Sequence, residues 1–167
     1  SPIPTLGVPD APALAPAPTQ APSAAAMPTP AQTAPNSTGR RFVLYYNDSG
    51  LYLLNDSGRE SPIAPLAFER LDASDAPQSR FEGARWSYYY PTSMPGWCIG
   101  AEILASAAYS RPAPCNDRFN SMVTPVREDK SIFWTPQPDG RQFRVLWNNQ
   151  QVGRCEIAAQ TCVVFLP

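Results

Sequence analysis

Short apolar runs separated by turn-forming residues dominate the chain from residue 41 onward. The first two runs, 42–46 and 51–54, are each followed by the tetrapeptide Asn-Asp-Ser-Gly. Asn and Asp side chains bond their own backbone and Gly tolerates a positive φ, so this tetrapeptide favours turns. The pattern therefore predicts two short strands and a hairpin.

Comparable runs continue to the C-terminus, and apolar and polar residues roughly alternate in 64–71 and 141–148, as half-buried strands require. Only 101–110 favours a helical turn. The remaining runs predict strands at 64–71, 79–87, 97–104, 120–124, 131–135, 141–148, 150–157 and 161–166. This spacing predicts an all-β domain over residues 40–167, an antiparallel β-sandwich or barrel-like fold of about 8–10 short strands.

Residues 1–39 differ sharply from that domain, because they contain ten of the 21 prolines and a single charged side chain, that of Asp10. Proline at this density excludes both a helix and a central strand. The remaining conformation is an extended polyproline-II arm, which at about 3.1 Å per residue spans on the order of 100 Å. Such a segment cannot order itself by burying its own apolar surface, so we expect a neighbouring copy to bind it.

The tip of the arm carries most of its large aliphatic side chains, while residues 15–35 are nearly all small or polar. Each of these side chains contributes roughly 1.5–3 kcal/mol if it is buried. A docking tip on a spacer is one interpretation and an ordinary linker is the other. The candidate docking residues are Ile3, Leu6, Val8 and Leu14.

Composition excludes several classes of function. The net charge of −1 provides no field for nucleic acid, and the absence of histidine excludes His-based catalysis and His-ligated metals. Glu69, Glu82 and Glu102 leave a carboxylate pair open in principle, but nothing in the sequence marks two of them as partners. We therefore expect no enzyme and no cofactor.

Four cysteines, an even number in a loop-rich β chain, predict disulfides and an oxidising compartment. One hairpin is expected around Asn148-Asn149-Gln150, and the next is expected from Cys155 to Cys162. Paired strands place opposed Cα atoms about 4.5–5.5 Å apart, within disulfide reach. We therefore pair Cys155 with Cys162 and Cys98 with Cys115, although two other pairings are possible in principle.

The location of the protein follows from the same features. The apolar runs are too short to cross a membrane, and a sequence that opens at Ser1 fits an exported product without its signal. We expect an extracellular or cell-surface protein.

Aromatic residues gather between positions 86 and 97. They suit a sugar-stacking platform or a groove for a proline-rich arm; the alternative is a core cluster with one exposed tyrosine. Because strand side chains alternate, a strand through the three tyrosines would turn at least one of them to the opposite face. The candidate residues are Trp86, Tyr88, Tyr89, Tyr90 and Trp97.

Two kinds of glycosylation site are also candidates. Three Asn-x-Ser/Thr triplets are present, and threonines beside proline and alanine resemble O-glycosylated stalks; simple solubility is the alternative for the threonines. The candidate positions are Asn36, Asn47, Asn55, Thr19, Thr29 and Thr33.

Residues 41–167 resemble a family of bacterial extracellular modules that occur at the C-termini of secreted or surface-anchored proteins, often behind Pro/Thr-rich linkers. The resemblance is carried by FVLYYNDSGLYLLN, LAFERLD, RFEGARW, Cys115-Asn116, FWT and the C-terminal FRVLWNNQQVGRCEIAAQTCVVFLP. The first segment also faintly resembles the lamin-tail β-sandwich. The resemblance implies a cell-surface setting and a β fold, and it transfers no catalytic residue.

Two functions fit these features. In the first, the chain is a structural subunit of an extracellular filament in which the arm of one subunit docks on the β domain of the next, because head-to-tail contacts that do not close generate open polymers. In the second, the chain is a cell-surface module on a stalk that binds a polysaccharide or a protein.

Overall fold

The computed structural model describes residues 38–116, 121–127 and 129–167. Within those ranges, nine strands of six or seven residues and two of two residues confirm the expected all-β fold. The strands are β1 Arg40–Tyr46, β2 Gly50–Asn55, β3 Ser61–Pro62, β4 Leu66–Leu71, β5 Pro77–Glu82, β6 Thr92–Ser93, β7 Cys98–Ile103, β8 Ser121–Val126, β9 Gln142–Trp147, β10 Gln150–Glu156 and β11 Thr161–Leu166.

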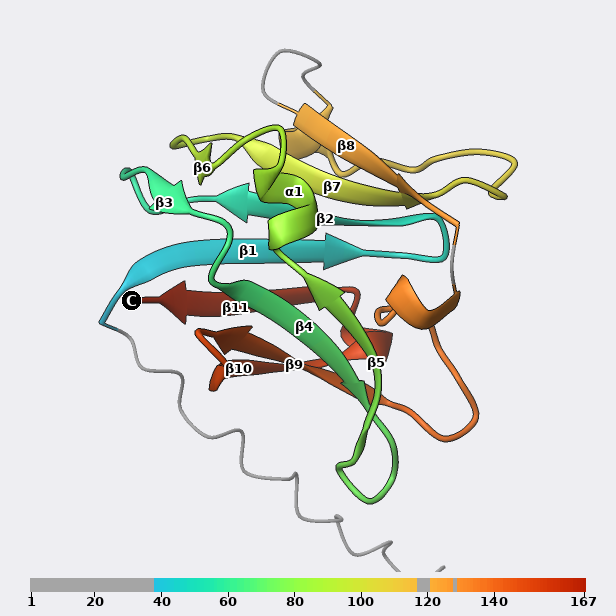
Figure 1. The fold of residues 1–167 in the computed structure, drawn as a ribbon. Helices are drawn as coiled ribbons and strands as arrows, with labels where there is room; N and C mark the ends of the chain where they lie inside the picture. Colours follow the sequence, from blue (N-terminus) through green and yellow to red (C-terminus); the bar gives the residue numbers. More distant parts are fainter. Residues whose placement is uncertain (1–37, 117–120, 128) are drawn as a thin grey trace, which may run out of the picture. The chain divides into compact units, whose positions relative to one another are not determined.

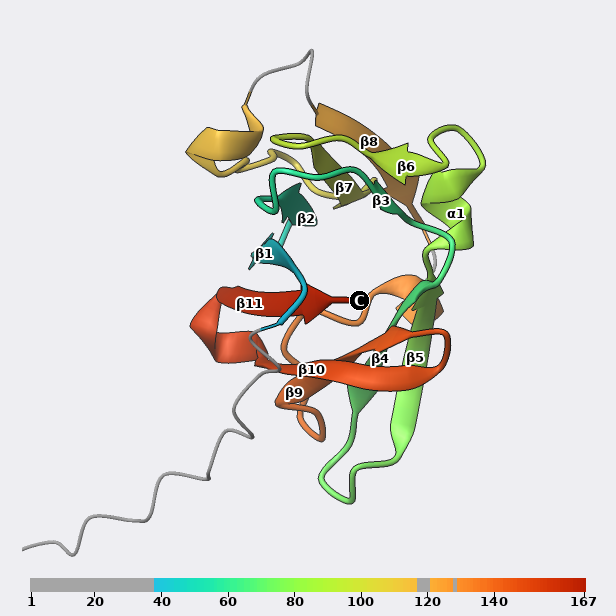
Figure 2. The same cartoon turned by 90° about the vertical axis from the view of Figure 1, so that its left-hand side faces the viewer.

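The long strands form two sheets that face each other (Figures 1 and 2). One sheet has the order β11-β1-β2-β7-β8 and the other has the order β10-β9-β4-β5, while β3 and β6 pair separately. Neighbouring strands are antiparallel, as expected for a sandwich, except that β8 runs parallel to β7. The sandwich is therefore mixed at the β8 edge.

The core lies between the two sheets and is rich in aromatic side chains. Phe68 stacks on Phe133 at 4.9 Å between ring centroids, and Phe143 contacts both Phe133 and Tyr46 edge-on at 5.1 Å. Leucines of β1 and β2 cover these rings from the five-stranded sheet. Burying side chains of this size supplies the main driving force for bringing the sheets together.

Two of the connecting turns follow the predicted chemistry. The Asn47 carboxamide oxygen accepts hydrogen bonds from the backbone N–H groups of Ser49 and Gly50, which closes the β1–β2 hairpin. Asn148 and Asn149 both have positive φ, as a two-residue type I′ turn requires, and they join β9 to β10. Two of the three expected hairpins, β1–β2 and β9–β10, are therefore confirmed.

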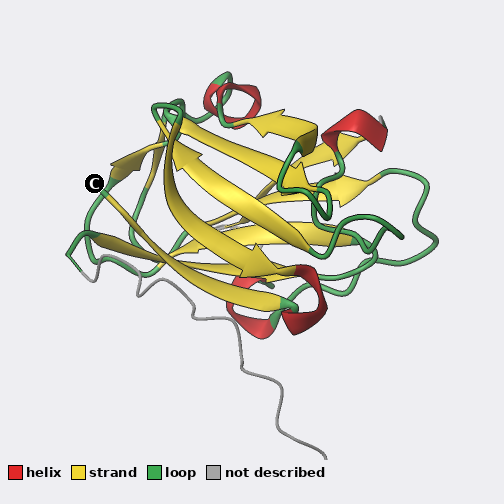
Figure 3. Ribbon diagram, turned by 90° about the horizontal axis from the view of Figure 1, so that it is seen from below, coloured by secondary structure: helices red, strands yellow, loops and turns green. Residues whose placement is uncertain are grey.

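The segment expected to be a strand over 79–87 changes conformation at Gly83. The strand β5 ends at Glu82, and a single helical turn, α1 Ala84–Ser87, follows Gly83. A Cβ atom on Gly83 would lie 2.2 Å from the Ile63 carbonyl oxygen, so the chain can pass here only as glycine. The helical turns, red in Figure 3, lie at the margins of the strands.

Two further predictions are wrong. Residues 131–135 form no strand: a 3₁₀ turn (η2 Asp129–Ser131) precedes Ile132, Phe133 and Trp134, which all point into the core. Three consecutive buried side chains are incompatible with a strand that alternates between two faces. Residues 101–110 contain no helix, because β7 extends to Ile103 and a turn follows it.

The expected hairpin between Cys155 and Cys162 is also wrong, although the cysteine pair is right. A 3₁₀ turn (η3 Ile157–Ala159) carries the chain from β10 to β11, which lie in different sheets: β10 pairs with β9 and β11 pairs with β1. β10 and β11 lie side by side at one edge of the sandwich, as Figures 1 and 2 both show. This corner connects the two layers covalently as well as by packing.

Candidate functional site

The most exposed aromatic residues lie directly after α1. Tyr88, Tyr89 and Tyr90 are 82%, 69% and 42% exposed, respectively. They form a turn in which the N–H groups of Tyr89 and Tyr90 donate to the Trp86 carbonyl oxygen. Because the three residues are not in a strand, none of them is turned back into the core, and the expectation of an oppositely facing tyrosine is wrong.

The two neighbouring tryptophans behave differently. Trp86 is only 1% exposed, its ring packs against Phe68 and Phe81, and its indole N–H donates to the Gly100 carbonyl oxygen at 3.1 Å. Trp97 is half-buried. The expected five-residue aromatic groove therefore does not form, because Trp86 belongs to the core, where it bridges from α1 to β7.

Three further exposed residues lie in the same loop as the tyrosines. Pro91, Met94 and Pro95 follow the tyrosines in the sequence, and Met94 is 38% exposed. We define the tyrosine surface as Tyr88, Tyr89, Tyr90, Pro91, Met94 and Pro95. The proline, glycine and methionine positions were not singled out in the sequence, although Met94-Pro95-Gly96 beside three tyrosines is the signal of an exposed loop.

Asn55 anchors the loop that carries this surface. Its side-chain nitrogen donates to the carbonyl oxygens of Ser93 and Arg59 at 2.8 and 2.7 Å. Its backbone N–H donates to the Trp97 carbonyl oxygen and its own carbonyl oxygen accepts from the Gly96 N–H. The end of β2 is thus bonded to the loop at Ser93, Gly96 and Trp97, which restricts the backbone that follows the tyrosines.

The same contacts correct the glycosylation prediction at Asn55. Its side chain is completely buried, and the nitrogen that would carry a glycan donates two hydrogen bonds inside the protein. At Asn47 the equivalent nitrogen donates to the Ser110 carbonyl oxygen at 2.7 Å. Both asparagines are turn residues whose amides are already engaged, so a glycan at Asn47 would have to break that bond.

The remaining predicted residues of the arm and its modification sites lie outside the described residues. They are Ile3, Leu6, Val8, Leu14, Thr19, Thr29, Thr33 and Asn36.

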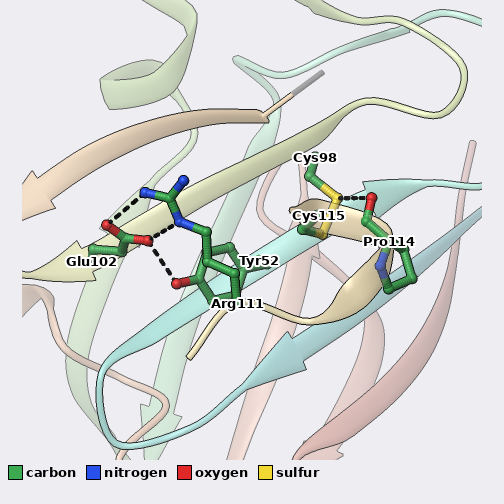
Figure 4. The surroundings of a disulfide bond; sticks show 6 residues. All are labelled: Tyr52, Cys98, Glu102, Arg111, Pro114 and Cys115. Carbon is green, nitrogen blue, oxygen red and sulfur yellow. Dashed lines mark hydrogen bonds and ion pairs between the residues drawn. A yellow bond between two sulfur atoms is a disulfide. The ribbon is translucent and has the colours of Figure 1, made fainter. Parts of the chain in front are cut away.

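Both disulfides join the cysteines as paired from the sequence: Cys98 to Cys115, with 5.4 Å between Cα atoms, and Cys155 to Cys162, with 5.7 Å. The first fastens the loop after β7, including its 3₁₀ turn (η1 Ala113–Cys115), back onto the start of β7 (Figure 4). The second joins β10 to β11 across the two sheets.

A polar cluster fastens the same loop a second time. Glu102 accepts hydrogen bonds from Arg111 Nε and the Tyr52 hydroxyl, both at 2.7 Å (Figure 4). Burial, followed by the hydrogen bond to Glu102, raises the pKa of Tyr52 well above its ordinary value. The phenol therefore stays protonated and serves as a permanent donor to the carboxylate.

The second charged cluster lies on the other sheet, where Glu69 is nearly buried. Arg80 from β5 approaches one carboxylate oxygen to 2.5 Å, and Arg144 from β9 approaches the other to 2.6 Å. Burial on its own would raise the pKa of Glu69, but hydrogen bonds from the two arginines outweigh that effect and lower it. The cluster joins three adjacent strands through their side chains.

These ion pairs bear on the carboxylate chemistry left open by the sequence. Glu82 also bonds Arg80, and Glu102 belongs to the opposite sheet. A general acid needs a raised pKa, whereas Glu69 has a lowered one. Each of the three glutamates is an ion-pair partner of an arginine in this fold.

The search of family models and of curated proteins finds no match to this chain. Among the residues described, every helix is too short or too polar to cross a bilayer.

Proposed function

We propose that this chain is an extracellular binding module carried on a proline-rich stalk, and that the tyrosine surface is its binding site. One observation carries the proposal: three consecutive tyrosines project from a loop that Asn55 bonds to the fold. Large exposed apolar patches on a folded domain mark interaction sites. Tyrosines are well suited to this role because their rings are rigid and amphipathic.

The anchoring of the loop supports a role for the tyrosines in ligand binding, because an ordered loop loses little conformational freedom when a ligand binds. A flexible loop loses conformational freedom when a ligand orders it, and that loss weakens binding. The hydrogen bonds of Asn55 and the pairing of β3 with β6 order this loop before any ligand arrives. The ligand classes that fit flat, uncharged aromatic rings are polysaccharides and proline-rich chains.

The extracellular setting is supported by two disulfides in a chain of 167 residues and by its resemblance to bacterial surface modules. The filament remains a prediction, because the arm residues that would form its contacts lie outside the described part of the chain. We place it second, since the tyrosine surface is the feature for which the described residues provide geometry.

The test is a binding screen of the full chain on a glycan array and on a set of proline-rich peptides. Replacing Tyr88 and Tyr89 together by serine should weaken every genuine interaction about 30-fold, because each ring contributes about 1 kcal/mol. Tyr109→Ser is the matched control, since Tyr109 is 41% exposed on a different loop. Absence of any ligand, or ligands that bind the double variant unchanged, would refute the proposal.

A further inference from the structure

The shape of the tyrosine surface narrows the class of ligand. The Tyr88 and Tyr89 rings lie 4.9 Å apart at 85° to each other, and both are largely exposed. Two perpendicular rings present a flat face beside an edge, a corner in which a pyrrolidine ring packs well. Aromatic surfaces of this kind bind proline-rich segments because such segments are already extended before they bind.

The absence of charged residues in this loop narrows the class of ligand further. Every residue between Arg85 and Glu102 is uncharged, so the loop with its tyrosines provides no ionic contact within its own sequence. The ligand should therefore be an uncharged chain with apolar rings and side chains along one edge.

The N-terminal arm of the chain contains such a sequence. A polyproline-II helix has three residues per turn, so every third residue lies along the same edge. Counted in this way from Ile3, one edge is entirely apolar, whereas the charge of Asp10 lies on a different edge. The residues on the apolar edge are Ile3, Leu6, Pro9, Pro12, Ala15 and Pro18.

The position of this edge in the chain favours binding between molecules. Residues 19–38 separate it from the β domain, and twenty residues at about 3.1 Å each amount to roughly 60 Å of extended spacer. A spacer of that length, when extended, would allow residues 3–18 to reach a neighbouring molecule.

We propose that residues 3–18 of a second copy bind the tyrosine surface, with the Ile3–Leu6–Pro9–Pro12 edge packed against Tyr88 and Tyr89. This inference rests on the proposed function, because it names the ligand of the same surface. Repeated from copy to copy, the contact produces a head-to-tail chain of subunits.

The test is photo-crosslinking of the full chain with Tyr89 replaced by p-benzoylphenylalanine, performed on an equal mixture of ¹⁴N- and ¹⁵N-labelled protein. The first 39 residues contain no lysine or arginine, so trypsin releases the arm as the single peptide 1–40. We expect this peptide as the main adduct, crosslinked within residues 3–18 and present in mixed isotope pairs. The same substitution at Tyr109 serves as the control and should not give that adduct.

Two arm variants test the proposed edge. Pro9→Ser with Pro12→Ser removes two prolines from the apolar edge, and Pro4→Ser with Pro16→Ser removes two from another edge. The first pair should lower the adduct yield about tenfold, the change that corresponds to 1.4 kcal/mol, while the second should leave it nearly unchanged. Equal effects of the two pairs would overturn the inference.

Adducts of unmixed isotope composition, adducts outside residues 3–18, or no adduct would overturn it as well. The binding screen separates this failure from failure of the proposed function. Suppose that the crosslink fails but the screen finds a glycan or peptide whose binding is lost in the Tyr88→Ser/Tyr89→Ser variant. The tyrosine surface would then still be a binding site, and the arm would not be its ligand.

Discussion

Asn55 links the core of the sandwich to the tyrosine surface through its side chain and its backbone at once. Its carboxamide oxygen accepts from the Ser57 hydroxyl and backbone N–H, while the nitrogen donates to the carbonyl oxygens of Arg59 and Ser93. A buried carboxamide with all of these partners satisfied is a strong local constraint, because the Ser93 carbonyl oxygen would otherwise lose its side-chain donor.

Replacing Asn55 by alanine should lower the free energy of unfolding by about 1–3 kcal/mol, since the buried Ser93 carbonyl oxygen loses its side-chain donor. The same substitution should weaken ligand binding at the tyrosine surface, because the loop loses its anchor. Urea unfolding measures the first effect. Asn116→Ala, at an exposed position, should change stability by less than about 0.5 kcal/mol. Equal stability of the two variants would show that Asn55 anchors nothing.

Glu69 gives the fold a pH dependence with a definite sign. Its pKa is lowered in the folded state from an ordinary value of 4.5, so its stabilising contribution is complete above about pH 4.5 and is lost as the pH falls through the folded-state value. Glu69→Gln should lower stability at pH 7 by about 1–2 kcal/mol and flatten the stability profile below pH 4.5. Urea unfolding at several pH values checks this, and an unchanged acid slope would contradict it.

For single residues, the sequence predicted the hydrogen-bonding role of a side chain better than it predicted whether that side chain is buried. The turn role of asparagine in Asn-Asp-Ser-Gly was predictable, because the side chain bonds its own backbone. That Asn55 is completely buried, whereas Asn47 is only half-buried, was not predictable, since burial depends on which loop folds over the turn. The same limit applies to Trp86, which lies two positions from the most exposed tyrosine.

At the scale of elements, the loop after β7 shows how covalent and polar contacts combine. The Cys98–Cys115 disulfide and the Glu102–Arg111 ion pair fasten it at two points. Replacing both cysteines by alanine should lower stability by about 3 kcal/mol in the chain-entropy model for a loop of 17 residues. It should also speed amide hydrogen exchange between residues 104 and 116.

The matched control for that variant is the replacement of Cys155 and Cys162 by alanine. The Cys155–Cys162 disulfide closes a loop of seven residues, so its removal should lower the free energy of unfolding by about 2.4 kcal/mol. Amide hydrogen exchange at residues 104–116 should not become faster. Exchange in that loop that is the same in both variants would contradict the local role assigned to Cys98–Cys115.

The elements that were predicted correctly are those whose apolar runs end in strong turn signals, such as β1, β2, β9 and β10. The strands that were predicted wrongly were apolar runs whose side chains fill the core from a loop or a helical turn. Phe133 and Trp134 fill the core from a loop, and Trp86 does so from a helical turn. Local composition could not separate these residues from strand residues, because apolar runs this short occur in both.

At the scale of the whole molecule, the all-β class and the two disulfides followed from strand spacing and cysteine count. The assignment of strands to sheets did not, because it depends on long-range pairing. The chain crosses from one sheet to the other between β10 and β11, and β8 joins β7 in parallel. The disulfide that seemed to close a hairpin instead fastens the two layers together.

The proposed function requires that the tyrosine surface is ordered before it binds and that ligands bind there. The most direct measurement is an NMR titration of the ¹⁵N-labelled full chain with its best ligand from the screen, combined with ¹⁵N relaxation of the free protein. We expect order parameters near 0.85 for the amides of residues 88–97 in the free protein, and chemical-shift changes on binding centred on that segment. Order parameters below about 0.6, or shifts centred on the Glu69 face of the other sheet, would contradict it.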